Sequence, residues 1–171
     1  LMANKSQLLI ATILILGFLS GCSTEQRMKD ITQISHTSDS GTILPELQWH
    51  EEYVITDGAV TFSRNGKIAE TQVNAGKWQI ALDEQQTAAL FKQLEAVDIA
   101  AIERVEPQDA PDGGGSASYA VVYAGGKTFN LYFDAGVVYN NSEPMFDPIN
   151  QFIQNLVLPA EAANRYNLSR P

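Results

Sequence analysis

The chain has 171 residues, of which 44% are hydrophobic and 18% are charged, a composition typical of one globular domain. It carries 11 Lys and Arg against 20 Asp and Glu, which gives a formal net charge of -9. Nucleic-acid affinity depends largely on basic side chains that neutralise phosphates, so this acidic balance argues against a protein that binds nucleic acids.

The first 21 residues have the pattern of a secretory signal peptide. Lys5 is the only charged residue before an apolar run over residues 8–19 that is interrupted only by Thr12. This run is shorter than the roughly 20 apolar residues that a spanning helix needs. Residues 1–21 are therefore expected to be removed during export rather than to stay as a membrane helix.

The predicted signal peptide is followed by the only cysteine in the chain, within Leu19-Ser20-Gly21-Cys22. This tetrapeptide resembles the lipobox of bacterial lipoprotein precursors at all four positions. The resemblance implies that a diacylglyceryl group is attached to the Cys22 thiol, that cleavage precedes Cys22, and that the new amino terminus is acylated. A lone cysteine has no disulfide partner within its chain, and a thiolate is the nucleophile that a thioether linkage requires. We therefore expect a lipoprotein of a bacterial cell envelope.

The lipid is expected to be the protein's membrane partner. A single acyl chain binds membranes marginally, at about 0.8 kcal/mol per buried methylene, whereas two or three chains hold firmly. The residue after the cysteine is Ser23 rather than aspartate, which in diderm members of the family implies export to the outer membrane. In a monoderm host the protein would stay on the outer face of the plasma membrane.

Residues 22–45 carry the lipidated amino terminus and are rich in Ser and Thr, with no sustained helical or strand period. We expect a flexible tether with a mean reach of roughly 25–30 Å, enough to lift a domain off the lipid headgroups. His36 lies in this segment and is expected to be a solvated linker histidine.

The first predicted hairpin surrounds Asp57-Gly58, a dipeptide that accepts the positive φ angles of a two-residue turn. The register of this turn places three cross-strand pairs on the buried face: Ile55 with Val60, Tyr53 with Phe62, and Glu51 with Arg64. The last pair is expected to be an ion pair at the rim of that face. The opposite, wetter face carries His50, Glu52, Val54, Thr61 and Ser63.

Further turns at residues 65–66 and 74–76 are expected to lead into strands over residues 67–73 and 77–82. Asp83 then has the features of a helix N-cap, and Gln86 is placed three residues later as in a capping box. Apolar residues follow at helical spacing and would cover the sheet: Leu90, Phe91, Leu94 and Val97. Residues 100–102 either extend this helix or form a separate turn.

A loop over residues 106–115 precedes a second predicted hairpin, whose strands flank Gly125-Gly126. A two-residue turn there would bury Ser118, Ala120 and Val122 against Phe133, Leu131 and Phe129. The other face would show Tyr119, Tyr123 and Tyr132, which could form a platform for a peptide, a glycan or an envelope protein. The simpler expectation is that other segments cover these tyrosines or that they form an ordinary strand surface.

The last predicted helix begins at Asp147-Pro148, as N-cap and first helical position. Its apolar stripe consists of Ile149, Phe152, Ile153, Leu156 and Val157. Residues 160–171 are expected to form a frayed or weakly helical tail.

The order of strands, helix, strands and helix, joined by hairpins, predicts a single α+β domain over residues 46–159. We expect an antiparallel sheet of five to six strands with two helices packed on one face. In outline this arrangement resembles many small lipoprotein domains.

Motifs for catalysis or metal binding are weak in the mature chain. Residues 126–128 lack the earlier glycine of a phosphate-binding loop and join two predicted strands. Residues 114–118 lack the final glycine of a nucleophile elbow. His50 is the only histidine within the expected domain and points outward, so neither a triad nor a structural zinc site is expected. We assign no catalytic residue, metal or cofactor.

Asp109 and Asp112 place two carboxylates in the glycine-rich loop. Their spacing does not match the alternating acidic ligands of an EF-hand, and Asp, Pro and Gly are common in ordinary turns. We group these two aspartates with the three tyrosines as a candidate binding surface.

The resulting hypothesis is a non-enzymatic binding or scaffolding module on a lipid anchor. The first alternative is an envelope hydrolase that uses two of the acids Glu51, Glu52, Asp109 and Asp112, which would have to converge across a cleft. The second alternative is a small-ligand or inhibitor module, which requires a concave apolar pocket or a protruding loop. The loop over residues 106–115 is where such a feature is expected.

Overall fold

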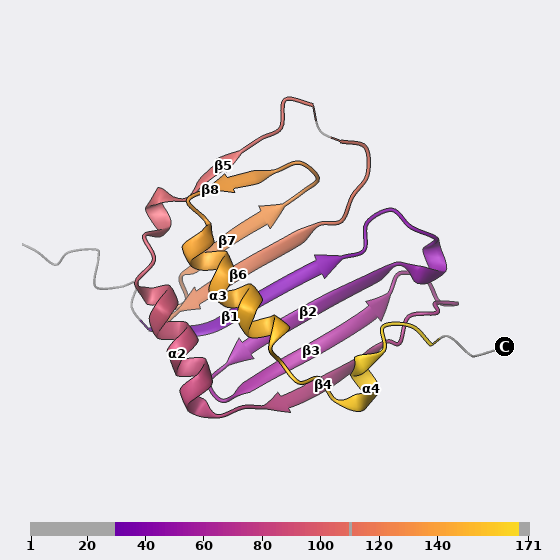
Figure 1. The fold of residues 1–171 in the computed structure, drawn as a ribbon, viewed down its shortest axis with the longest axis horizontal. Coiled ribbons are helices and arrows are strands. Elements are labelled where there is room, and N and C mark those ends of the chain that lie inside the picture. The colour runs from indigo at the N-terminus through magenta and orange to yellow at the C-terminus, as the bar shows by residue number, and fades with distance from the viewer. Residues whose placement is uncertain (1–29, 110, 168–171) are drawn as a thin grey trace, which may run out of the picture.

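The structure, a computed structural model that describes residues 30–109 and 111–167, is built on a six-stranded antiparallel sheet with helices on one face (Figure 1). The strands are β1 (Ile31–Asp39), β2 (Trp49–Thr56), β3 (Ala59–Gly66), β4 (Gly76–Ala81), β5 (Glu103–Val105), β6 (Ala117–Tyr123), β7 (Thr128–Phe133) and β8 (Val138–Asn140). The helices are α2 (Glu84–Glu95), α3 (Glu143–Gln154), α4 (Ala160–Ala163) and the short 3-10 helices η3 (Pro45–Leu47) and η4 (Ile99–Ala101). The predicted α+β class is confirmed.

The strand order in the large sheet is β4-β3-β2-β1-β6-β7, and β5 pairs with β8 in a small second sheet. Helices α2 and α3 contact each other above the large sheet. The core lies between the sheet and these helices, and its largest fully buried side chains include Phe62, Ile34, Ile55 and Ile149.

Strand β1 lies between β2 and β6 in the middle of the sheet. The prediction of a flexible tether over residues 22–45 is therefore wrong for residues 31–39, and the domain begins well before residue 46. Ile31 and Ile34 are the only large aliphatic residues in this strand, and both are buried. Its residues on the open face of the sheet are polar, and His36, on the face that the described helices cover, is polar as well. Such a strand lacks an alternating hydrophobic pattern, the main sequence signal for a strand.

The first hairpin has the predicted register, with Ile55 opposite Val60 and Glu51 opposite Arg64. The predicted ion pair is present, with Arg64 Nε 2.6 Å from Glu51 Oε1, but it is buried rather than at a rim. Strand β4 forms close to its predicted place, whereas the strand expected over residues 67–73 does not form. The sixth strand of the sheet is β1 instead.

The second hairpin differs from its predicted register by one residue. Its loop has three residues, because the Tyr123 N–H donates to the Lys127 carbonyl at 2.8 Å. Gly125 and Gly126 both have positive φ, at 90° and 84°, a conformation that glycine adopts without strain. Tyr119 therefore lies opposite Leu131, and β6 turns its tyrosines to the core. A slip of one residue exchanges the two faces of a strand.

Helix α2 begins with the predicted capping box. The Asp83 carboxylate accepts from the Gln85 N–H at 2.9 Å, and the Gln86 side chain accepts from the Asp83 N–H at 3.3 Å. Residues 99–101 form the separate turn η4, the second of the two possibilities left open by the sequence.

Helix α3 is present but begins at Glu143, four residues before the predicted N-cap. Pro148 is inside the helix, where it removes one amide donor but is buried beside Ile149. Val157 is 86% exposed, because the helix ends at Gln154 before the predicted stripe is complete.

The C-terminal segment is part of the domain. Residues 160–163 are helical as α4, Ala162 is fully buried, and Tyr166 forms a β-bridge with Val73. The predicted boundary at residue 159 is therefore too early. Of the two expectations for this segment, weak helicity is confirmed for residues 160–163, and fraying is wrong for residues 160–167. Contacts with a distant loop hold this segment, and its own sequence gives little indication of them.

A row of aromatic rings crosses the helix-covered face of the sheet from β6 to β4. The centroid distances are 4.4 Å for Tyr119 and His36, 6.4 Å for His36 and Tyr53, 4.6 Å for Tyr53 and Phe62, and 5.4 Å for Phe62 and Trp78. Rings at these distances stabilise the core beyond the area that they bury.

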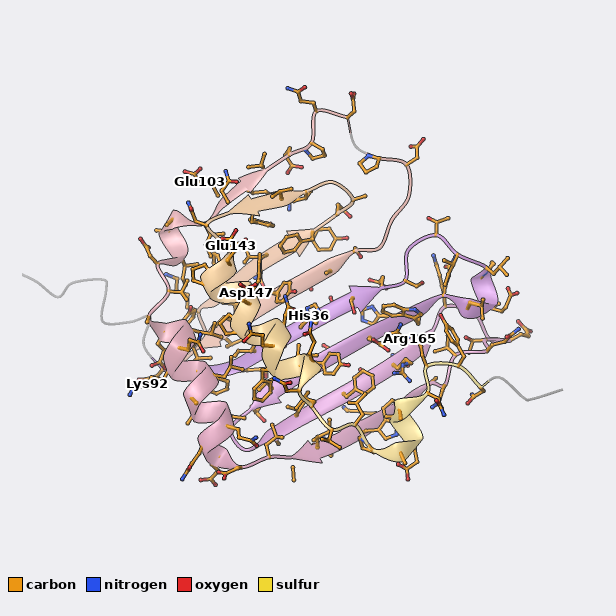
Figure 2. All side chains as sticks on the ribbon, viewed as in Figure 1. His36, Lys92, Glu103, Glu143, Asp147 and Arg165 are labelled. Carbon is orange, nitrogen blue, oxygen red and sulfur yellow. The ribbon has the colours of Figure 1, made fainter. Side chains whose placement is uncertain are left out.

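His36 lies inside this row (Figure 2), so the expectation of a solvated linker histidine is wrong. Its Nδ1 donates a hydrogen bond to the Ser118 carbonyl at 3.1 Å. Burial lowers the pKa of His36 below its ordinary value of 6.5 and outweighs the Ser118 hydrogen bond and the charge of Glu51, which both raise it. The imidazole is therefore neutral at pH 7.

This buried histidine predicts a loss of stability in mildly acidic solution. Because the pKa of His36 is lower in the folded than in the unfolded chain, the unfolded chain takes up the proton first as the pH falls through 6.5. The free energy of unfolding then decreases until the pH reaches the folded-state pKa, with a slope of at most about 1.4 kcal/mol per pH unit. We expect His36→Gln to remove this slope in urea unfolding between about pH 5 and 7.5, and His50→Gln to retain it. An unchanged slope in His36→Gln would contradict this assignment.

Candidate functional site

A cavity of about 770 Å³ lies at the end of the sheet where β1 and β7 end and where β2 and β6 begin. The lining consists of residues 39–42, 48–50, 66–67, 113–116 and 134–135, together with Pro111 and Tyr132. His50 and Tyr132 point to the face of the sheet opposite the helices, because their chain neighbours Glu51 and Leu131 are buried under the helices.

Two loops form one wall of the cavity by direct contact between their backbones. Figure 1 shows the loops after β1 and before β6 side by side at this end of the sheet. A Cβ atom on Gly41 would lie 2.3 Å from the Gly114 carbonyl oxygen, and one on Gly115 would lie 2.4 Å from the backbone carbonyl oxygen of Asp39. The wall therefore depends on glycine in both loops.

Asp39 holds two other side chains of the cavity. Its Oδ1 accepts a hydrogen bond from His50 Nδ1 at 3.0 Å, and its Oδ2 accepts one from the Ser116 hydroxyl at 3.1 Å. The Asp39 N–H also donates to the Ser116 carbonyl at 2.9 Å. Because His50 Nδ1 is the donor, Nε2 is the acceptor of the neutral imidazole. The side chains of Asp39 and His50 remain 43% and 44% exposed, within reach of a ligand.

Tyr132 supplies an aromatic surface to the cavity, and hydrogen bonds to its backbone fix its position. The Tyr139 hydroxyl donates to the Tyr132 carbonyl at 3.1 Å and accepts from the Tyr132 N–H at 3.2 Å. The guanidinium of Arg104 donates to the same carbonyl. Tyr132 itself is 48% exposed.

The tyrosine platform that the sequence allowed is not present, and the simpler expectation, that other segments cover these side chains, is confirmed for Tyr119 and Tyr123. Tyr119 and Tyr123 are buried in the core, and burial raises the pKa of both hydroxyls. The Tyr119 hydroxyl donates to Asn150 Oδ1 at 2.8 Å on helix α3. Of the three predicted tyrosines, only Tyr132 is exposed, and it lines the cavity.

The other predicted site residues do not meet at the cavity. Asp109 and Asp112 are exposed in the loop, and neither lines the cavity, although Pro111 and the neighbouring glycines do. The glycines of this loop therefore line a concave site as expected, but that site lacks the aliphatic lining of the apolar pocket that was expected, and the two aspartates do not line it. Cys22 and the predicted signal peptide lie outside the described residues.

The acids suggested for a hydrolase are also apart from the cavity. Glu51 is buried on the helix-covered face and accepts hydrogen bonds from Arg64 and Arg165. Neither Glu51 nor Glu52 lines the cavity, whose carboxylates are those of Asp39 and Asp134. Reasoning from the sequence identified neither aspartate as a candidate site residue. The one signal for Asp39 was its place just before Ser40-Gly41, in a segment interpreted as a tether.

In the described ranges, no group of three or more His, Cys, Asp or Glu side chains is placed to hold a metal ion. No helix within those ranges is long and apolar enough to cross a membrane.

The chain matches no protein-family model, no curated protein and no solved structure. The class of the described part of the protein therefore rests on its structure alone: it is an α+β domain with a polar cavity at one end of an antiparallel sheet.

Proposed function

We propose that this chain is a lipid-anchored module of a bacterial cell envelope that binds a ligand in the cavity beside Asp39 and does not catalyse a reaction. The observation that supports a binding function is the cavity itself. Its volume of about 770 Å³ lies within the range of about 300–1,000 Å³ typical of small-ligand sites. Its polar side chains converge from strands β1, β2 and β7 and from four of the connections between strands, which suits recognition of a polar ligand.

The position of β1 supports an arrangement in which the cavity faces away from the membrane. Only the eight residues 23–30 separate Cys22 from Ile31, and a chain of that length spans at most about 30 Å. A lipid on Cys22 would therefore keep the start of β1 near the headgroups. Asp39 lies at the other end of this nine-residue strand, about 26 Å away at the usual rise of about 3.3 Å per residue (Figure 1).

Binding is favoured over catalysis by the hydrogen bonds of Ser116. Its hydroxyl donates to Asp39 and not to His50, whereas a serine nucleophile has to give its proton to a base. The second candidate function is a hydrolase in which His50 Nε2 acts on a water molecule, because the Asp39–His50 pair resembles a base with its orienting carboxylate. That candidate predicts that His50→Gln abolishes turnover while ligand binding persists.

The lipid anchor is tested with Cys22→Ala in the full chain expressed in a diderm bacterium. We expect the variant to stay uncleaved and to incorporate no fatty-acid probe, because no other thiol is present to form the thioether. Ser23→Ala, which leaves Leu19 to Cys22 intact, is the matched control and should be labelled and cleaved normally. Normal labelling of Cys22→Ala would show that the anchor is elsewhere or does not exist.

A further inference from the structure

We propose that the cavity beside Asp39 binds an uncharged saccharide. This proposal rests on the proposed function, since it takes the cavity as the ligand site, and it adds the chemical class of the ligand. Three properties of the lining carry it: its lack of large aliphatic side chains, its balance of charges, and one exposed aromatic ring held in place among hydrogen-bonding groups.

The lining does not suit an apolar ligand. Among the described residues that form it there is no Val, Leu, Ile, Met or Phe. Its large apolar side chains are the aromatic rings of Tyr132 and Trp49, and the Arg165 guanidinium lies 4.1 Å from the centroid of the Trp49 ring. A lipid chain or another apolar molecule binds by removing apolar surface from water, which requires apolar surface on both sides. The open position at the end of the sheet would leave such a ligand partly in water.

The charges of the lining disfavour an anionic ligand and do not single out a cationic one. Asp39 and Asp134 supply two carboxylates against the single ammonium of Lys67. An anion would meet net repulsion in a chain whose formal charge is already -9. A small cation would in turn be repelled by Lys67, which lines the same cavity.

The hydrogen-bonding groups match sugar hydroxyls, each of which both donates and accepts. A carboxylate accepts at about four lone-pair positions, so Asp39 keeps acceptor capacity beyond its two protein donors. His50 Nε2 is a further acceptor, while Gln48 and Lys67 are donors at the same cavity. Hydrogen bonds to charged groups contribute more than neutral ones, and a missing hydroxyl would leave them unpaired.

Tyr132 provides the apolar complement to these groups. A saccharide ring has a face of C–H groups, and an exposed tyrosine offers flat apolar area with a polar tip. Two hydrogen bonds with the Tyr139 hydroxyl, one accepted from the Tyr132 N–H and one donated to the Tyr132 carbonyl, hold the Tyr132 backbone before any ligand arrives. A surface that is already ordered loses little conformational freedom on binding.

The test uses the mature lipidated protein in a zwitterionic detergent, because sugar-based detergents would compete for the site. Binding is measured by calorimetry and ligand-observed NMR with maltotriose, cellotriose and tri-N-acetylchitotriose, and with trigalacturonate and spermidine as anionic and cationic probes. We expect at least one neutral trisaccharide to bind, and Tyr132→Ala and Asp39→Asn each to weaken it by about fivefold or more. Asp112→Asn, in the same loop but outside the lining, is the matched control and should leave the affinity unchanged.

Several outcomes would overturn the proposal. Failure of all three neutral trisaccharides to bind at millimolar concentration would exclude this ligand class. Binding that is unaffected by Tyr132→Ala, an exposed substitution that leaves the core intact, would place the saccharide at another site. Spermidine binding that depends on Asp39 and Tyr132, without saccharide binding, would reject the saccharide and leave the cavity as the ligand site. The fatty-acid labelling of Cys22 tests the anchor separately from all of these results.

Discussion

Replacing Glu51 with alanine is expected to lower the free energy of unfolding by about 3–5 kcal/mol. Glu51 and Arg64 are only 5% and 3% exposed, and Arg64 Nε lies 2.6 Å from Glu51 Oε1. Arg165 also donates to both oxygens of Glu51, each at 3.0 Å (Figure 2). Removal of the carboxylate would leave the Arg64 guanidinium buried without a counter-charge, which is the costly way to break such a pair.

Glu51→Ala should also loosen the C-terminal segment over residues 160–167, because the Arg64 guanidinium that pairs with Glu51 holds this segment as well. Arg64 Nη1 donates to the carbonyls of Ala162 and Asn164, at 3.1 and 2.9 Å. Urea unfolding of the mature protein measures the loss, and hydrogen exchange at residues 160–167 reports the release of the segment.

Two further variants decide the cause of this loss. Glu52→Ala, on the opposite face of the same strand, should change the free energy of unfolding by no more than about 0.5 kcal/mol. The double variant Glu51→Leu with Arg64→Leu should recover the part of the loss that comes from the uncompensated buried charge, but it should still release residues 160–167, because it also removes the Arg64 hydrogen bonds to Ala162 and Asn164. A loss below about 1 kcal/mol in Glu51→Ala would contradict the structural role of the ion pair.

Gly41→Ala is expected to destabilise the protein and to open one wall of the cavity. The new methyl group would lie 2.3 Å from the Gly114 carbonyl oxygen, an overlap that costs about 1–3 kcal/mol. Gly41 also has a φ of 71°, where a side chain costs roughly 1–2 kcal/mol more. The free energy of unfolding and saccharide affinity should therefore both decrease.

Gly125→Ala is the matched control for this substitution. Gly125 has a φ of 90°, but no atom lies within 4 Å of the position its Cβ would take. This variant carries the conformational cost without the overlap, so it should destabilise less than Gly41→Ala and leave the cavity unchanged. Equal losses in the two variants would show that the contact between the two loops is not tight.

Local chemistry explains which elements could be predicted. The Asp57-Gly58 hairpin has the expected register, because its turn and both strands agree within ten residues of sequence. The capping box at Asp83 and Gln86 is also local, since it satisfies the backbone donors of the first helical turn.

The register of the second hairpin could not be predicted from local sequence. Gly125-Gly126 is compatible with loops of two or three residues, and both choices give plausible faces for β6. Packing of the core selects the three-residue loop. This loop buries Tyr119, Val121 and Tyr123, which are larger than Ser118, Ala120 and Val122 on the face that was predicted to be buried. Burial of apolar area favours this register over the predicted one.

The sequence by itself determined the α+β class, the first hairpin and the start of helix α2, whereas the lipid that the resemblance implies at Cys22 stays a prediction. Only the tertiary structure decided that β1 belongs to the sheet and that Asp39, His50 and Ser116 meet. These three residues come from separate segments, and none follows a recognisable motif. The physical reason is that a polar strand pairs through its backbone, and backbone hydrogen bonds leave no hydrophobic period for a sequence to display.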